Sequence, residues 1–303
     1  MTNFILIAIC ILAGILFRRS QFLPSDAHKG INAWILYIAM PAVSFKYLPH
    51  IQWSKELLLP ALSPVVVWVC AWLIITFYCK KQHLDRATNG AMKIVTGLAN
   101  TSFVGFPLIM AYFGEKEISI AIICDQVTFL LLSTVGIYTS IQASGNSSIS
   151  ISSIAKKLFL FPPFMAFIAA MVLPHFVDIS PLNPLFDKLA GTVGPLALFS
   201  IGLQLQFSGW KEQWKHLSFA LFYKLLLAPV LISVIAIALQ IKGTIAQISI
   251  FEAAMPTMLT VTVLADTYNL NPKLSNLIVC ISIVMSFVTT FLWWVFLTYS
   301  GLF

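Results

Sequence analysis

Residues 57–78 read LLLPALSPVVVWVCAWLIITFY, a run of 22 positions without one charged side chain. An α-helix rises 1.5 Å per residue, so about 20 apolar residues cross the hydrocarbon core of a bilayer. Similar runs recur along the chain, in which 59% of the 303 residues are hydrophobic and 10% are charged. A soluble domain usually carries about 25% charged residues. The sequence therefore predicts an all-α integral membrane protein.

The apolar runs, separated by charged or turn-rich breaks, predict ten transmembrane helices. In chain order these spans lie near 3–17, 30–48, 57–78, 90–113, 118–140, 158–174, 187–207, 217–240, 244–265 and 274–299. The first span is followed by Arg18-Arg19 and preceded by no basic residue, the reverse of a cleaved signal peptide, so we expect it to be retained. The five cysteines show no metal-ligand spacing, and neither a metal nor a cofactor is indicated.

The distribution of Lys and Arg predicts how the chain is oriented. With the N-terminus outside, twelve basic residues fall in inner connections and five in outer ones, and Lys224 remains inside span eight. Cytoplasmic loops carry the excess of basic residues. We therefore expect a multi-pass protein of the cell membrane with both termini outside. Its net charge of +7 resides largely in these loops, so it indicates the lipid bilayer and no nucleic-acid partner.

A polar stretch in the middle of the chain predicts two halves. Residues 142–153 read QASGNSSISISS, a Gly- and Ser-containing sequence typical of a flexible linker. We expect a first five-helix repeat at 1–141, a cytoplasmic linker at 142–157 and a second five-helix repeat at 158–303. Because five is odd, the second half enters the membrane from the opposite face. This is the inverted-repeat plan common among secondary transporters.

The two halves place prolines alike. Span two contains IAMPAVSF with Pro41 and span seven contains VGPLALFS with Pro195, whereas FVGFPL in span four and EAAMPT in span nine supply Pro107 and Pro256. The two prolines are 66 residues apart in the first half and 61 in the second. Prolines are frequent in membrane helices, so this match supports the repeat without proving it.

Spans four and nine are weak helices. Span four carries Gly97, Asn100, Thr101, Ser102, Gly105 and Pro107 within eleven residues. Span nine carries Pro256, Thr257, Thr260 and Thr262. Two interrupted helices at equivalent places in an inverted repeat are expected to cross near the bilayer midplane, where half-helix N-termini offer partial positive charge to an anion. The alternative is that both prolines merely kink packed helices.

Three ionisable residues fall at membrane depth, where charge is costly and usually functional. They are Asp125 in span five, Glu252 in span nine and Lys224 in span eight. One interpretation is coupling of transport to a proton or cation, with Lys224 compensating an acid or attracting the anion. The other is a set of buried polar contacts, in which an acid pairs with Lys224 or a broken helix end.

The segment Asn100 to Leu108, NTSFVGFPL, resembles the N-T-x-x-x-G-x-P-L motif of the auxin efflux carrier family, which includes the plant PIN-type carriers. Further segments are similar to the same family: Ile31-Asn32 with Pro41 and Ser44-Phe45, Gly194 to Leu203, Ala253 to Pro256, and Ala265 to Asn269. The resemblance covers essentially the whole chain except the central loop.

The resemblance implies ten helices in two inverted five-helix repeats, with a crossover of broken helices four and nine. Spans one, two, six and seven would form a scaffold domain, and the other six spans would form a transport domain. The resemblance also favours a homodimer through the scaffold helices. By position, Asn100 matches the crossover asparagine that contacts a substrate carboxylate, and Ser44 and Gln126 match polar residues of the same pocket. With the crossover residues Thr101, Pro107, Pro256 and Thr257, these form the candidate substrate site.

The resemblance also implies a function: transport of small organic anions, either auxin-like or dicarboxylate acids. Plant members carry an acidic residue and a lysine in span three, whereas residues 57–73 have no charge here, so that support site is not carried over. Enzyme motifs are absent from the sequence. Two alternatives stay open: a sodium-coupled organic anion symporter of the bile-acid-carrier type, for which Asn100, Gln126 and Glu252 supply oxygens, and a non-transporting sensor on the same fold.

Overall fold

The computed structural model describes residues 2–51, 54–145, 162–205 and 213–303. Within these ranges the chain is helical and contains no β-strand, although one isolated antiparallel bridge joins Ala99 to Thr257. The all-α prediction is confirmed for this part of the chain. The predicted linker begins at residue 142, but residues 142–144 are helical, because the helix that starts at Ile137 continues to Ser144. The part of the linker at 146–157 lies outside the described residues.

Six of the described helical segments are long and apolar enough to cross a membrane. They are Thr2–Arg19, Ala27–His50, Lys55–Lys81, Glu115–Ser144, Trp214–Ala238 and Pro272–Tyr299. They coincide with predicted spans one, two, three, five, eight and ten, which confirms a multi-pass membrane protein. Predicted spans four, six, seven and nine contain shorter helices, among them the apolar segments Thr101–Tyr112 and Pro162–His175. The count of ten spans and the inverted repeat stay predictions.

The chain divides into two compact units, each built from separate stretches of sequence. Unit 1 comprises the described parts of Met1–Trp53, Ser102–Ile122 and Ala155–Leu205. Unit 2 comprises the described parts of Ser54–Thr101, Ile123–Ile154 and Gln206–Phe303. This division follows spatial contacts, whereas the predicted repeats run along the chain, so the repeat boundaries are not tested by it.

Unit 1 contains seven α-helices among its described residues, together with the first residues of an eighth. They are α1 (Thr2–Arg19), α2 (Ala27–Trp34), α3 (Met40–Tyr47), α6 (Phe106–Tyr112), α10 (Pro162–Val172), α11 (Asn183–Ala190), α12 (Val193–Gln204) and the start of α7 (Ile118–Leu131), which continues into unit 2. The π-helix η1 (Ile35–Ala39) joins α2 to α3. Short 3₁₀ turns are η2 (Leu48–His50), η5 (Glu115–Glu117), η7 (Leu173–His175) and η8 (Ser180–Leu182).

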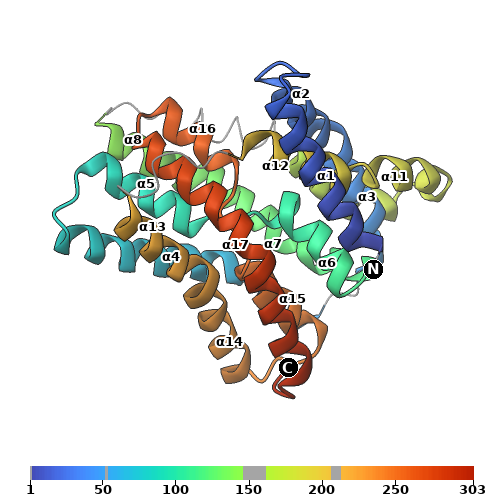
Figure 1. Ribbon diagram of the computed structural model, residues 1–303. Coiled ribbons are helices and arrows are strands. Elements are labelled where there is room, and N and C mark those ends of the chain that lie inside the picture. The colour runs from blue at the N-terminus through green and yellow to red at the C-terminus, as the bar shows by residue number, and fades with distance from the viewer. Residues whose placement is uncertain (1, 52–53, 146–161, 206–212) are drawn as a thin grey trace. The chain divides into compact units, whose positions relative to one another are not determined.

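The closest packing in unit 1 is between α1 and α12, which lie side by side in Figure 1. Gly14 and Gly202 meet at their crossing, and a Cβ atom on Gly202 would lie 2.3 Å from the carbonyl oxygen of Ile11. Only glycine permits this approach, because any side chain would meet backbone. A hydrogen bond of 2.6 Å from Ser200 Oγ to Asn32 Oδ1 ties α12 to α2 in addition.

Two ion pairs of Lys46 connect three further elements of unit 1. Lys46 Nζ lies 2.6 Å from Glu115 Oε1 and 2.9 Å from Asp187 Oδ1, which connects α3 with η5 and α11. The Phe45 and Phe186 rings stack next to these ion pairs, with centroids 5.1 Å apart. These contacts join residues from both sequence halves into one unit.

Unit 2 contains the two longest α-helices among the described residues, α4 (Leu58–Lys81) and α17 (Pro272–Tyr299). Its other α-helices are α5 (Arg86–Gly97), the rest of α7, α8 (Ile137–Ser144), α13 (Trp214–Phe222), α14 (Ala228–Ala238), α15 (Thr244–Ala253) and α16 (Thr260–Thr267), with the 3₁₀ turn η3 (Lys55–Leu57). Two π-helices interrupt them: η6 (Leu132–Gly136) between α7 and α8, and η9 (Tyr223–Leu227) between α13 and α14.

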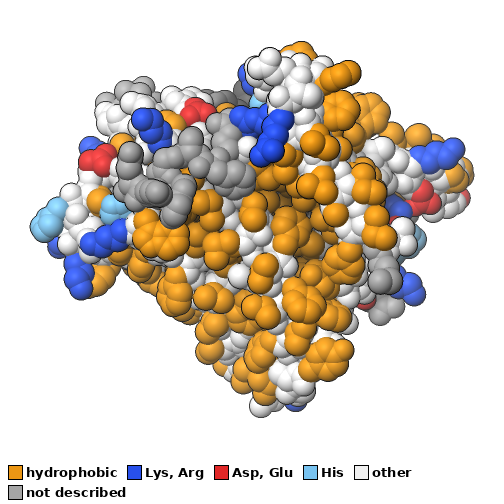
Figure 2. All heavy atoms as spheres, in the orientation of Figure 1, with side chains coloured by type: hydrophobic (Ala, Val, Ile, Leu, Met, Phe, Trp, Pro, Cys, Tyr) orange, Lys and Arg blue, Asp and Glu red, His pale blue; other side chains and the backbone are white. Residues whose placement is uncertain are grey.

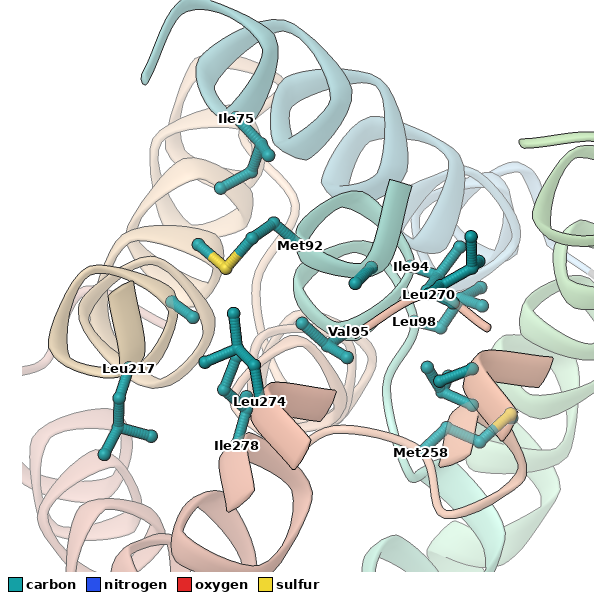
Figure 3. Close-up of a cluster of buried hydrophobic side chains, with 14 of the residues drawn as sticks. Ile75, Met92, Ile94, Val95, Leu98, Leu217, Met258, Leu270, Leu274 and Ile278 are labelled. Carbon is teal, nitrogen blue, oxygen red and sulfur yellow. The ribbon is translucent and has the colours of Figure 1, made fainter. Parts of the chain in front are cut away.

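The hydrophobic core of unit 2 forms around α5. Met92, Val95 and Leu98 belong to one buried cluster with Leu217 of α13 and Leu274 of α17. Figure 3 shows Val95 near Leu274, and Leu98 beside Leu270. Outward-facing side chains of α14 and α17 are also apolar: Val234 and Val288 are 58% and 63% exposed. Figure 2 shows hydrophobic side chains gathered over these two helices. An apolar core together with an apolar exterior is expected of helices that lie in lipid.

Candidate functional site

Both predicted weak helices are interrupted in the structure. Helix α5 ends at Gly97, Leu98 is extended, and a π-helix, η4 (Thr101–Gly105), begins three residues later. Helix α15 ends at Ala253 and α16 begins at Thr260. We call residues 98–100 and 254–259 the paired breaks. Gly97 allows the first break to approach α4, since a Cβ atom there would lie 2.5 Å from the Trp68 ring.

Backbone groups of the two paired breaks form hydrogen bonds with each other. Asn100 N–H donates to Pro256 O at 2.8 Å, and Met258 N–H donates to Leu98 O at 3.1 Å. These bonds flank the antiparallel bridge between Ala99 and Thr257. A membrane offers no water to backbone groups that leave a helix, so each break supplies the partners that the other requires.

Thr257 fastens the second break to two other elements of unit 2. Its hydroxyl donates to Val95 O at 2.7 Å, and its backbone N–H donates to Ser282 Oγ of α17 at 3.1 Å. Thr257 and Ser282 are both fully buried. Ser282 is not among the candidate site residues predicted from the sequence. A signal existed, because Ser275, Ser282 and Ser286 are seven and four residues apart and fall near one helical face.

Pro107 and Pro256 have different places. Pro256 lies within the second break and its carbonyl accepts the bond from Asn100. Pro107 lies in the first turn of α6, where a missing N–H costs little. Pro107 and Ser44 belong to unit 1, and Ser44 donates to Met40 O of its own helix at 3.3 Å. The remaining candidate site residues belong to unit 2.

Buried polar side chains accompany the paired breaks. Asn100 is 2% exposed, and Thr101 Oγ1 donates to Asp125 Oδ1 of α7 at 2.6 Å. Gln126 is buried beside Asp125, and its Oε1 atom has no hydrogen-bond partner among the described residues. A side-chain amide carries N–H donors that can bind a carboxylate, whereas the Thr101 hydroxyl has already given its single proton to Asp125.

Glu252 lies one residue before the end of α15 and is 1% exposed. Neither carboxylate oxygen has a hydrogen-bond partner among the described residues. Asp125 and Lys224 are near enough to interact with it electrostatically, although no ion pair within 4.0 Å joins Glu252 to a described residue. Burying a carboxylate without a partner is unfavourable unless a proton or a cation compensates it.

A small cavity lies beside Glu252 within unit 2. Ser63, Thr101, Cys124 and Thr128 contribute polar atoms to its wall. Its interior leaves about 10 Å³ for the centre of a water molecule, which is the space that about one water needs. Among the described residues, no group of three or more His, Cys, Asp or Glu side chains is placed to hold a metal ion.

Comparison with known proteins identifies the family. The family described as "Membrane transport protein" matches residues 1–294. The chain belongs to this family. This confirms the resemblance to auxin efflux carriers, and with it a membrane transporter, since the family and the related proteins are named transporters or carriers and not enzymes.

Individual relatives align over nearly the whole chain. A protein of Methanocaldococcus jannaschii named an uncharacterized transporter is 26% identical, over 97% of both chains. A putative malonate transporter of Rhizobium meliloti is 24% identical, over 92% of this chain and 90% of its own. Auxin efflux carrier component 8 of Arabidopsis thaliana is 22% identical, over 90% of each.

Proposed function

We propose that this membrane transporter is a secondary carrier, and an efflux carrier, of small organic anions such as auxin-like or dicarboxylate weak acids. The observation that carries the proposal is the hydrogen-bonded pairing of the two breaks next to buried Asn100 and Thr101. The names of two relatives, the putative malonate transporter and the auxin efflux carrier component, support the proposed substrate class.

The chemistry of the paired breaks suits a carboxylate. A helix that begins at membrane depth presents N–H groups and partial positive charge at its N-terminus. The hydroxyls of Thr101 and Thr257 already donate their single protons to Asp125 Oδ1 and Val95 O, so these two residues shape the proposed site. The side-chain amide of Asn100 adds two N–H donors. In a water-poor site such donors favour an anion over a neutral solute. Gln126 and Pro256 belong to the same unit as Asn100 and are part of the proposed substrate site. Ser44 and Pro107 belong to unit 1, and their proposed role in substrate binding rests on the family resemblance alone.

We also propose that transport uses an elevator-type alternating access. Unit 1 gathers the predicted spans one, two, six and seven, which the resemblance assigns to the scaffold, together with the second part of span four. Unit 2 gathers spans three, eight, nine and ten with the first part of span four and most of span five. Two units assembled from both sequence halves are compatible with one body moving substrate past another. A homodimer through the scaffold helices is part of the same proposal.

For energy coupling we propose a proton, or the membrane potential alone. An inside-negative potential drives a monoanion outward, worth about 2.3 kcal/mol per charge per 100 mV, so an exporter needs no co-transported ion. Glu252 is the proposed proton carrier because its buried oxygens lack hydrogen-bond partners among the described residues. Asp125 and Lys224 are its charged neighbours and complete the coupling group.

Uptake of radiolabelled malonate and indole-3-acetate into proteoliposomes tests the proposal. We expect saturable, potential-dependent movement of at least one of these acids, and competition by unlabelled carboxylates. Empty liposomes provide the background, and liposomes containing the Asn100→Ala variant should transport more slowly at low substrate concentration. If the acids bind, as seen by a rise in the unfolding temperature, but do not cross, the chain is a sensor. Transport that stops on removal of sodium at fixed pH favours the symporter alternative.

A further inference from the structure

Among the described residues of unit 2, three charged side chains are buried, and they lie in one neighbourhood. Asp125, Lys224 and Glu252 are 4%, 0% and 1% exposed. Glu252 interacts electrostatically with both of the others. One lysine accompanies two acids, so the group as a whole still lacks one positive charge when all three are ionised.

Two hydrogen bonds to backbone carbonyl oxygens fix the position of Lys224, one from the neighbouring Tyr223 and one from its own ammonium group. Lys224 lies in the π-helix η9, a widened turn of a kind that frequently occurs at functional sites. The adjacent residue Tyr223 fixes that turn, because its hydroxyl donates to Val67 O of α4 at 2.6 Å. The Lys224 ammonium donates to the carbonyl oxygen of Ala253 at 3.3 Å.

Ala253 is the last residue of α15, where the helix breaks off inside the unit. The C-terminal end of a helix carries partial negative charge and carbonyl oxygens without helical partners. In transporters with broken helices, such ends are where a coupling cation binds. In this chain the position is taken by the ammonium group of a side chain.

We propose that Lys224 is a built-in cation that takes the place of a coupling ion beside Glu252 and Asp125. This proposal rests on the proposed transport function and adds that the site is independent of sodium and potassium. The positive charge of Lys224 compensates the negative charge of the buried acids, and its ammonium group hydrogen-bonds the carbonyl oxygen at the C-terminal end of α15. The water-sized cavity beside Glu252 then holds water and not a metal cation.

Removal of the lysine charge should therefore make the stability of the protein depend on a cation from solution. Lys224→Met keeps the length and the apolar stem of the side chain but leaves the buried acids uncompensated, which is strongly destabilising. In detergent, at constant ionic strength, we expect wild-type protein to unfold at the same temperature in sodium as in N-methylglucamine. Lys224→Met should unfold several degrees lower in N-methylglucamine and regain part of that loss in sodium.

Two further variants separate charge compensation from packing. Lys224→Met combined with Glu252→Gln removes one charge of each sign, so we expect this double variant to be more stable than Lys224→Met and insensitive to sodium. Lys93→Met is the matched control, because Lys93 is a half-buried lysine of the same unit that lies over the Trp72 ring. It should show no response to sodium.

The proposal is overturned if sodium stabilises the wild-type protein, or if Lys224→Met is as stable as wild type without a response to cations. If Lys224→Met cannot be purified, recovery of folded protein in the double variant supports the proposal, and failure of both variants counts against it. These measurements use no substrate, so they decide the role of Lys224 even if the carboxylates tested are not transported.

Discussion

The backbone N–H of Asn100 donates to the carbonyl oxygen of Pro256 at 2.8 Å, across 156 positions of sequence. Proline cannot donate a backbone hydrogen bond, but its carbonyl remains a full acceptor. Each residue lies where a helix is interrupted, so each backbone group finds its partner in the other break. Asn100 supplies the donor and Pro256 supplies the acceptor. The polar site thus lies at the point where two weak helices meet, within unit 2.

Replacing Asn100 with Ala should weaken the binding of carboxylate substrates. Two amide donors are lost, and a hydrogen bond to a charged group contributes about 1.5–3 kcal/mol. The dissociation constant of the transported acid, measured by titration of the purified protein, should rise accordingly. Asn89→Ala, which alters another asparagine of the same unit, is the control and should bind as wild type. Unchanged affinity in a folded Asn100→Ala protein would exclude this role.

Replacing Glu252 with Gln should remove the pH dependence of transport while leaving substrate binding largely intact. The amide keeps the shape of the carboxyl group but cannot carry the proton. Initial rates in proteoliposomes across a series of pH values provide the measurement, with Glu56→Gln, an exposed acid of unit 2, as the control. A wild-type pH profile in Glu252→Gln, together with transport that requires sodium, would replace the proton hypothesis by the sodium alternative.

Replacing Ser282 with Ala should destabilise unit 2 more than the same change at Ser286. Ser282 Oγ accepts the buried N–H of Thr257, whereas Ser286 donates to Ile283 O of its own helix at 2.7 Å. Leaving a buried donor without a partner costs about 1–3 kcal/mol. Thermal unfolding of the two purified variants provides the comparison. Equal unfolding temperatures would mean that Thr257 is held by other contacts.

Replacing Gly202 with Ala should destabilise unit 1. The new Cβ atom would lie 2.3 Å from Ile11 O and 2.9 Å from Gly14 Cα, so α1 and α12 have to separate. Overpacking of this kind typically costs about 1–3 kcal/mol. Gly30→Ala is the matched control, because a Cβ atom at Gly30 meets nothing within 4 Å. Yield and unfolding temperature of Gly202→Ala should both fall below those of Gly30→Ala.

Residues 142–153 should face the cytoplasm, with both termini outside. The expectation follows from the twelve basic residues that this orientation places inside against five outside. Single cysteines placed in the stretch, in a background without the five native cysteines, should resist a membrane-impermeant thiol reagent in intact cells and react after permeabilisation. Ready labelling of intact cells would reverse the orientation.

The sequence by itself determined the class of protein and the six long helical spans. An apolar run such as 57–78 cannot form the surface of a soluble protein. The length and spacing of apolar runs are local properties, so the sequence alone shows them. The weakness of the helices around Asn100 and Pro256 was also local, because Gly, Pro, Asn and Thr disfavour the interior of a helix whatever the rest of the fold. Family membership followed from the motif at Asn100 to Leu108 and is confirmed by the match to residues 1–294.

Only the tertiary structure decided which groups meet. Thr101 and Asp125 are 24 residues apart, Lys224 and Ala253 are 29 apart, and Val95 and Thr257 are 162 apart, yet each pair shares a hydrogen bond. No local propensity encodes such pairs. They are selected because a buried polar group without a partner is costly, and the partner is whichever donor or acceptor the fold brings within reach. For the same reason the serine pattern of α17 does not reveal its partner, and only the fold shows that Ser282 accepts the N–H of Thr257.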